Sequence, residues 1–150
     1  MSDKIKFELE LTSEHFYALL QVLELAARCG MGQFGELADF FDVPERDYTG
    51  SIPLYARRET CERVLKAILM PELGSPRAYY SITAQIVPKS AQYAWELYQT
   101  LRCVNAWHNA GNPAQRDWST MLGVQYDAPM AISGKVLPVV SEFTRTSDDV

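Results

Sequence analysis

The chain has 150 residues, of which 47% are hydrophobic and 22% charged, and its formal net charge is −5. This length fits one domain, and the composition excludes an intrinsically disordered chain. The acidic balance argues against a sequence-blind nucleic-acid binder, which needs a basic surface, so no long nucleic acid is expected as a partner.

The cysteines indicate a reducing compartment, and the hydropathy indicates that the chain is neither secreted nor inserted in a membrane. The three cysteines form no C-x-x-C motif and no cluster with histidine, which is typical of reduced thiols. The first residues lack the basic-then-apolar pattern of a secretory signal, and no apolar run approaches the roughly 18 residues that a membrane-spanning helix needs. We therefore expect a cytoplasmic protein with no membrane partner.

The start of the chain predicts a strand followed by two helices. Residues 4–11 alternate between apolar and charged side chains, which is the pattern of a half-buried strand. Thr12 or Ser13 then caps a helix, and Gly30 is expected as the left-handed residue that ends it. A short helix is expected over residues 33–41.

A long helix is expected in the middle of the chain. After a loop over residues 42–53, the helix runs from Leu54 to Met70 and is stopped by Pro71. Its apolar face comprises Cys61, Val64, Leu65, Ile68 and Leu69.

A second strand and a last helix follow. Residues 78–87 are rich in Tyr, Ile, Thr and Val, which favours a strand ended by Pro88. Ser90 is expected to cap a helix that runs to about His108. Beyond it the pattern is less periodic, and short extended pieces are expected at residues 124–126 and 136–140.

These elements predict an α+β fold in which about four helices pack on a small, mainly antiparallel sheet. Residues 4–11 and 78–87 would seed that sheet. We expect a single globular domain over residues 1–143 and a disordered tail over residues 144–150.

The run Gly30-Met-Gly-Gln-Phe-Gly35 matches the pattern G-x-G-x-x-G. In dinucleotide-binding proteins this pattern follows a strand and opens a helix, so that backbone amides meet a pyrophosphate. Here the preceding element is predicted to be a helix. We therefore interpret the glycines as a bend between two helices, with phosphate binding as the alternative.

The sequence offers no complete catalytic or metal-binding motif. The two histidines, His15 and His108, lack the partners of a zinc site or a phosphoesterase pair. Cys103 and His108 are five apart on a predicted helix and do not face each other. No G-x-S-x-G is present, so we assign no catalytic residue, metal or cofactor, and a hydrolase using His108 is the least favoured interpretation.

Guanidinium groups and aromatic rings are what proteins use to neutralise a phosphate and to stack a base. The middle of the chain is rich in both, and residues 51–110 carry a net charge of +3, against −6 for residues 1–50. The candidate ligand-binding residues are Arg57, Arg58, Tyr79, Tyr80, Lys89, Trp107 and Arg116. The alternatives are packing or subunit contacts, and a scatter of charge over a solvated surface.

The segment from Leu20 to Leu37, with its core Arg28-Cys-Gly-Met-Gly-Gln-Phe34, resembles small tailed-bacteriophage proteins that carry an R-x-G-x-G-Q-F/L-x-E-L turn. The later half of those proteins is similar to the runs 93–98, 126–130 and 133–134 here. The resemblance implies a phage accessory protein in a bacterial cytoplasm. Such non-virion proteins often antagonise host defence, and the resemblance transfers no catalytic residue.

Together these observations lead to two functional hypotheses. The first is a non-catalytic phage accessory protein, expected to be a homo-oligomer, that counters host defence by sequestering a small nucleotide-like signal. The alternative is a protein–protein interaction module that binds and inhibits a host or phage protein. Its recognition face would be the acidic first fifty residues, including Glu36 and Asp39.

Overall fold

The structure is a computed structural model that describes residues 9–41, 52–109 and 129–140. These residues form four α-helices and one short 3₁₀ helix. In chain order they are α1 (Ser13–Gly30), α2 (Glu36–Phe40), α3 (Leu54–Leu69), η1 (Pro71–Leu73) and α4 (Lys89–Asn109). None of the helices in these ranges is long and apolar enough to cross a lipid bilayer.

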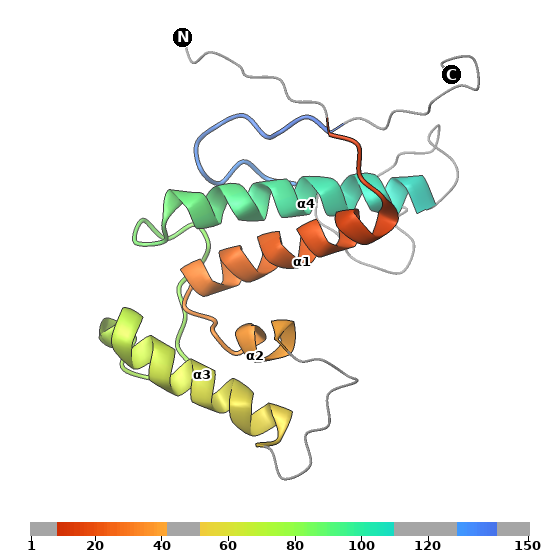
Figure 1. Cartoon of the computed structure of the whole chain (residues 1–150). Helices are drawn as coiled ribbons and strands as arrows, with labels where there is room; N and C mark the ends of the chain where they lie inside the picture. The colour runs from red at the N-terminus through yellow and green to blue at the C-terminus, as the bar shows by residue number, and fades with distance from the viewer. Residues whose placement is uncertain (1–8, 42–51, 110–128, 141–150) are drawn as a thin grey trace, which may run out of the picture.

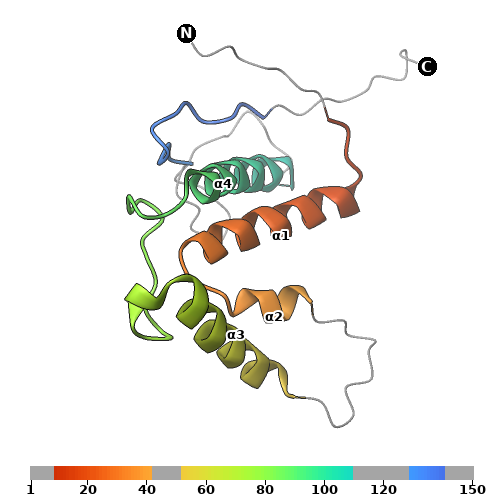
Figure 2. The ribbon, with the colours of Figure 1, turned by 60° about the vertical axis from the view of Figure 1, so that its left-hand side comes forward.

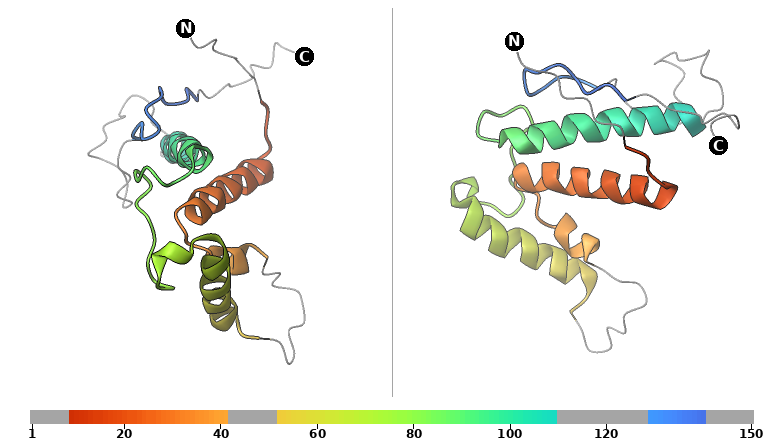
Figure 3. Two further views of the ribbon diagram at one scale, coloured as in Figure 1. Left: turned by 90° about the vertical axis from the view of Figure 1, so that its left-hand side faces the viewer. Right: turned by 45° about the horizontal axis from the view of Figure 1, so that its top comes forward.

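The helices are stacked in layers (Figure 1). Helices α1 and α4 lie side by side and run in opposite directions, and α2 and α3 lie on the other side of α1. The segment 129–140 crosses α4 on the face turned away from α1, as the rotated view in Figure 2 confirms. The end-on view in Figure 3 shows the same order of layers.

Helix α1 begins as its sequence predicts. Thr12 has extended backbone angles, and its Oγ1 accepts a hydrogen bond from the His15 backbone N–H at 3.4 Å. Glu14 lies in the first turn, where hydrogen bonds from the backbone and from Thr12 lower the pKa of its carboxyl group. The prediction of a cap at Thr12 or Ser13 is therefore confirmed, with Thr12 as the capping residue.

Helix α1 ends at Gly30 as predicted, but the left-handed residue that follows it is Gly32. Met31 is still right-handed, and Gly32 adopts φ +87°. The Gly32 N–H donates to the Cys29 carbonyl at 3.0 Å, and the Gln33 N–H donates to the Arg28 carbonyl at 2.9 Å. This pair of bonds is a Schellman motif with Gly32 as its left-handed glycine, so the assignment of that role to Gly30 is wrong.

Gly30 instead permits the contact between α1 and α4. It lies inside the helix, and a Cβ atom placed on it would collide with the side chain of Ala91 on α4. Ala27, one turn earlier, is completely buried. Small residues on both helices therefore let the two backbones approach closely, and no large side chain among the described residues is fully buried.

The predicted sheet is wrong, because the described residues contain no strand. Residues 78–81 have no regular structure, and residues 82–87 fold into turns, in which the Ala84 N–H donates to the Ser81 carbonyl and the Val87 N–H donates to the Ala84 carbonyl. Residues 9–11 and 136–140 have no regular structure either, and the predictions for 4–8 and 124–126 lie outside the described residues. Strand-forming residues build a strand only beside a partner strand, and here their amides are satisfied by local turns.

The later helices largely follow their predictions. Helix α3 ends at Leu69, one residue before the predicted end, and Pro71 opens η1. Helix α4 begins at Lys89 directly after Pro88, so Ser90 lies inside its first turn and does not cap it.

A buried carboxylate holds the segment 129–140 against α4. Glu96 is 3% exposed and accepts hydrogen bonds from the backbone N–H groups of Ile132 and Ser133, both at 2.7 Å. Its second oxygen accepts from the Ser133 hydroxyl at 2.9 Å. Lys89 adds a bond from its Nζ to the Ser133 carbonyl at 3.1 Å. The carboxylate thus has donors from the segment on both of its oxygens.

Candidate functional site

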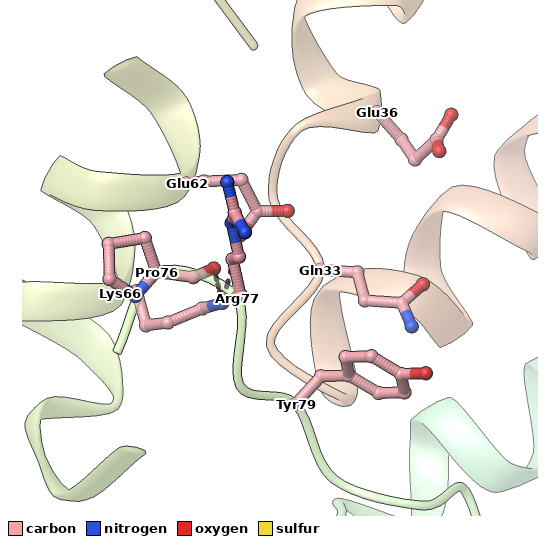
Figure 4. Close-up of a pocket in the computed structure, with 7 residues that line it drawn as sticks. All are labelled: Gln33, Glu36, Glu62, Lys66, Pro76, Arg77 and Tyr79. Carbon is pink, nitrogen blue, oxygen red and sulfur yellow. Dashed lines mark hydrogen bonds and ion pairs between the residues drawn. The ribbon is translucent and has the colours of Figure 1, made fainter. Parts of the chain in front are cut away.

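An open hollow of about 360 Å³ lies where the turn after α1 meets α3 and the loop after η1. Figure 4 shows the side chains that line it, which come from segments far apart in the sequence. They are Gln33, Glu36, Glu62, Lys66, Pro76, Arg77 and Tyr79. Its volume falls in the range of small-molecule sites, which is roughly 300–1,000 Å³.

The first wall of the hollow is fixed by Glu62 of α3. Its Oε1 accepts a hydrogen bond from the Gly35 backbone N–H at 2.9 Å, and its Oε2 lies 3.0 Å from Lys66 Nζ. A backbone amide of the glycine-rich turn is thus bound to a carboxylate of this protein. Since α1 precedes the turn, the strand that a dinucleotide-binding turn requires is absent and the predicted helix-to-helix bend is confirmed.

The second wall is the loop after η1, which Lys66 holds in place. Lys66 is 4% exposed, and its Nζ donates to the Pro76 carbonyl at 2.5 Å and to the Ala78 carbonyl at 2.7 Å. Its third partner is the Glu62 carboxylate, with which the ammonium group forms an ion pair. This buried cation is therefore part of the wall and is not available to a ligand.

Tyr80 closes the loop onto the glycine-rich turn. Its backbone N–H donates to the Met31 carbonyl at 2.9 Å, and its hydroxyl donates to Glu72 at 3.0 Å. The loop is thereby bonded on both sides of Tyr79. The side chains of Arg77 and Tyr79 are exposed, whereas Ala78 and Tyr80 are half-buried.

Four groups in the hollow have the chemistry to bind a ligand. The Arg77 guanidinium makes no hydrogen bond or ion pair with any residue that the structure describes, and the Tyr79 side chain is 60% exposed. Gln33 contributes an amide whose Oε1 accepts from Arg28 at 3.0 Å. Glu36 contributes a carboxylate that lies 3.9 Å from Arg28. A cation, an aromatic ring, an amide and a carboxylate thus share one hollow.

Of the seven residues predicted to bind a ligand, Tyr79 lines this hollow. Arg58 pairs with Asp39 of α2 through two hydrogen bonds, one of them 2.7 Å long, and this pairing raises the pKa of the guanidinium. Arg57 is half-buried on α3. Tyr80 and Lys89 make the structural contacts described above, at Glu72 and at Ser133. The Trp107 side chain and Arg116 lie outside the described residues.

Sequence reasoning missed Arg77, Gln33, Glu62 and Lys66. No local signal marked Arg77, because it lies in the turn-rich loop that precedes the predicted strand over residues 78–87. No local signal marks Lys66, because the carbonyl groups that it binds are brought to it only by the turn after η1.

A second groove of about 310 Å³ lies between α1 and α2. Its carboxylates are Glu24, Glu36 and Asp39, and Leu25 and Phe40 add apolar surface. Glu24 pairs with Arg28 at 2.7 Å and Asp39 pairs with Arg58, so most of the remaining negative charge of the groove is that of Glu36. Glu36 lines this groove as well as the hollow.

No protein-family model matches the chain, and neither a curated protein nor a solved structure shows significant similarity to it. Within the described ranges, no three histidine, cysteine or acidic side chains are grouped closely enough to hold a metal ion. The hollow and the groove are therefore the features of this protein that bear on its function.

Proposed function

We propose that this protein binds and sequesters a small nucleotide-like ligand in the hollow beside the glycine-rich turn, without transforming it. The observation that carries the proposal is that the exposed Tyr79 ring and the Arg77 guanidinium line the same hollow, on a loop that is bonded to α3 and to the turn. In the setting that the bacteriophage resemblance implies, such binding would remove a host defence signal.

The two side chains supply the two interactions that a nucleotide needs. An aromatic ring stacks on the face of a base, which contributes roughly 1–3 kcal/mol per base. A guanidinium forms charge-assisted hydrogen bonds with phosphate oxygens in a planar, two-pronged geometry. Because the backbone of the loop is held by Lys66 and Tyr80, little backbone entropy is lost when a ligand binds, and the main entropic cost is the ordering of the two exposed side chains.

Isothermal titration calorimetry against cyclic and linear nucleotides tests this proposal. We expect heat of binding with wild-type protein, and a loss of about tenfold or more in affinity for Arg77→Ala and for Tyr79→Ala. The matched controls are Arg63→Ala and Tyr55→Ala, which remove an exposed arginine and an exposed tyrosine on α3 outside the hollow. The proposal is wrong if no nucleotide binds, or if the controls lose as much affinity as the variants of the hollow.

A protein–protein interaction module is the second candidate, favoured by the groove between α1 and α2. Glu36 and Asp39, the two acidic residues singled out in the sequence, both line that groove beside the exposed ring of Phe40. Such a groove suits a basic segment of a partner. A peptide carrying arginine and leucine should bind the wild type and lose affinity in Glu36→Lys. Equal affinity for both proteins would exclude this candidate.

A further inference from the structure

Among the residues that the structure describes, the charges around the hollow leave a single cation for a ligand. Four charged side chains line it, namely Glu36, Glu62, Lys66 and Arg77. The Lys66 ammonium is buried, donates to two backbone carbonyl groups and forms an ion pair with Glu62. Arg77 is the remaining cation among the described lining residues, and it has no described partner.

The carboxylates of the hollow act against a highly charged ligand. Glu36 has a half-exposed side chain, and the arginine nearest to it, Arg28, is already bonded to Glu24 at 2.7 Å. Glu62 is fixed in the wall. A ligand that brings one negative charge would have it neutralised by Arg77. Each further negative charge would meet no free described cation and would lie near at least one carboxylate.

We propose that the hollow selects a planar-ring ligand that carries a single negative charge, which among nucleotides means a phosphodiester such as a cyclic mononucleotide. Nucleotides with a terminal phosphate carry at least one further charge and are disfavoured. This inference rests on the proposed function, because it assumes that the ring stacks on Tyr79 and that the anion pairs with Arg77.

Glu36 sets the strength of this selection. Replacement of its carboxylate by an amide keeps the size of the side chain and removes the repulsion of the second and later negative charges. Glu36→Gln should therefore tighten the binding of doubly and multiply charged nucleotides more than the binding of a cyclic nucleotide. Glu59→Gln is the matched control, since Glu59 is exposed on α3 and does not line the hollow.

Calorimetric titrations of the full chain with adenosine, cyclic AMP, AMP and ATP at one low ionic strength test the inference. Cyclic AMP should bind most tightly, adenosine more weakly for lack of an anion, and each additional charge should weaken binding roughly two- to fivefold. In Glu36→Gln the ratio between the dissociation constants of ATP and cyclic AMP should fall. In Glu59→Gln this ratio should stay as in the wild type. The guanine series repeats the comparison with a second base.

The outcomes separate this inference from the proposed function. If AMP or ATP binds as tightly as cyclic AMP, the charge selection is wrong while the binding function stands. If Glu36→Gln leaves the ratio between these dissociation constants unchanged, Glu36 does not set the selection and the inference fails. If no nucleotide in either series binds, the proposed function itself fails, and the inference fails with it.

Discussion

Individual glycines decide how the turn after α1 is built. Gly32 has φ +87°, and a Cβ atom on it would lie 2.9 Å from both Leu73 Cδ1 and Met70 Sδ. Gly74 has φ +64°, yet a Cβ atom on it would meet no atom within 4 Å. The two positions share a left-handed backbone and differ in the space around it.

This difference predicts the effect of alanine at the two sites. The left-handed backbone alone costs an alanine about 1–2 kcal/mol, which is the expected loss of unfolding free energy for Gly74→Ala. Gly32→Ala should lose slightly more, because the ends of the Leu73 and Met70 side chains must also move aside. Urea denaturation followed by circular dichroism measures both. An equal loss in the two variants would contradict the close packing around the turn.

Cys29, near the end of α1, makes the stability of the turn region depend on pH. Burial, with a smaller contribution from the negative charge of Glu62, raises the pKa of its thiol. The folded protein therefore holds this proton more tightly than the unfolded chain. The associated stabilisation is complete below the unfolded pKa of about 8.5 and is lost as the pH rises through the folded pKa.

The alkylation of Cys29 by iodoacetamide should accordingly begin at a higher pH in the folded protein than in the urea-unfolded chain. Peptide mass spectrometry after timed labelling follows this cysteine separately from Cys61 and Cys103. The same pH dependence of alkylation in folded and unfolded protein would show that the Cys29 thiol is not buried in the folded protein.

The packing of α1 against α4 is the main contact between helices, and it depends on the pair Gly30 and Ala91. Alanine is a better helix former than glycine by about 1 kcal/mol, which by itself would favour Gly30→Ala. Overpacking in a close helix contact costs about 1–3 kcal/mol. Since the obstructing atom is a Cβ fixed to the α4 backbone, we expect the collision to dominate.

A double-mutant cycle tests this contact. Gly30→Ala should lower the free energy of unfolding by about 1–2 kcal/mol, and Ala91→Gly should lower it through the loss of a buried methyl group and of helix propensity. The double variant Gly30→Ala/Ala91→Gly exchanges the two residues and restores the space. It should therefore lose less than the sum of the single variants. Additive losses would exclude a direct contact.

Helix ends are specified by residues close in the sequence, whereas a strand forms only if a distant segment pairs with it. The start of α1 follows from Thr12 and the end of α3 from Pro71, and both effects act within one helical turn. The strand over 78–87 was wrong, because whether a β-prone segment pairs is decided by distant residues. Here the Tyr80 amide bonds to Met31 and the carbonyl of Ala78 bonds to Lys66.

At the scale of the whole molecule, charged side chains join the layers. Arg58 joins α3 to Asp39 of α2, Glu62 joins α3 to the turn after α1, and Glu96 joins α4 to the segment 129–140. Composition suggested that cations of the middle segment serve a ligand, and Arg58, Lys66 and Lys89 are bonded within the protein instead. A sequence reveals the charges but not which of them are already paired, so Tyr79 could be chosen and Arg77 could not.

The account as a whole depends on the hollow being a binding site, and NMR of the ¹⁵N-labelled full chain titrated with cyclic AMP tests that most directly. Backbone amide shifts should change in a saturable manner at Gln33, Glu36, Arg77, Ala78 and Tyr79, and the changes should vanish in Arg77→Ala. Saturable changes that lie along the groove between α1 and α2, or no change up to millimolar ligand, would contradict the claim.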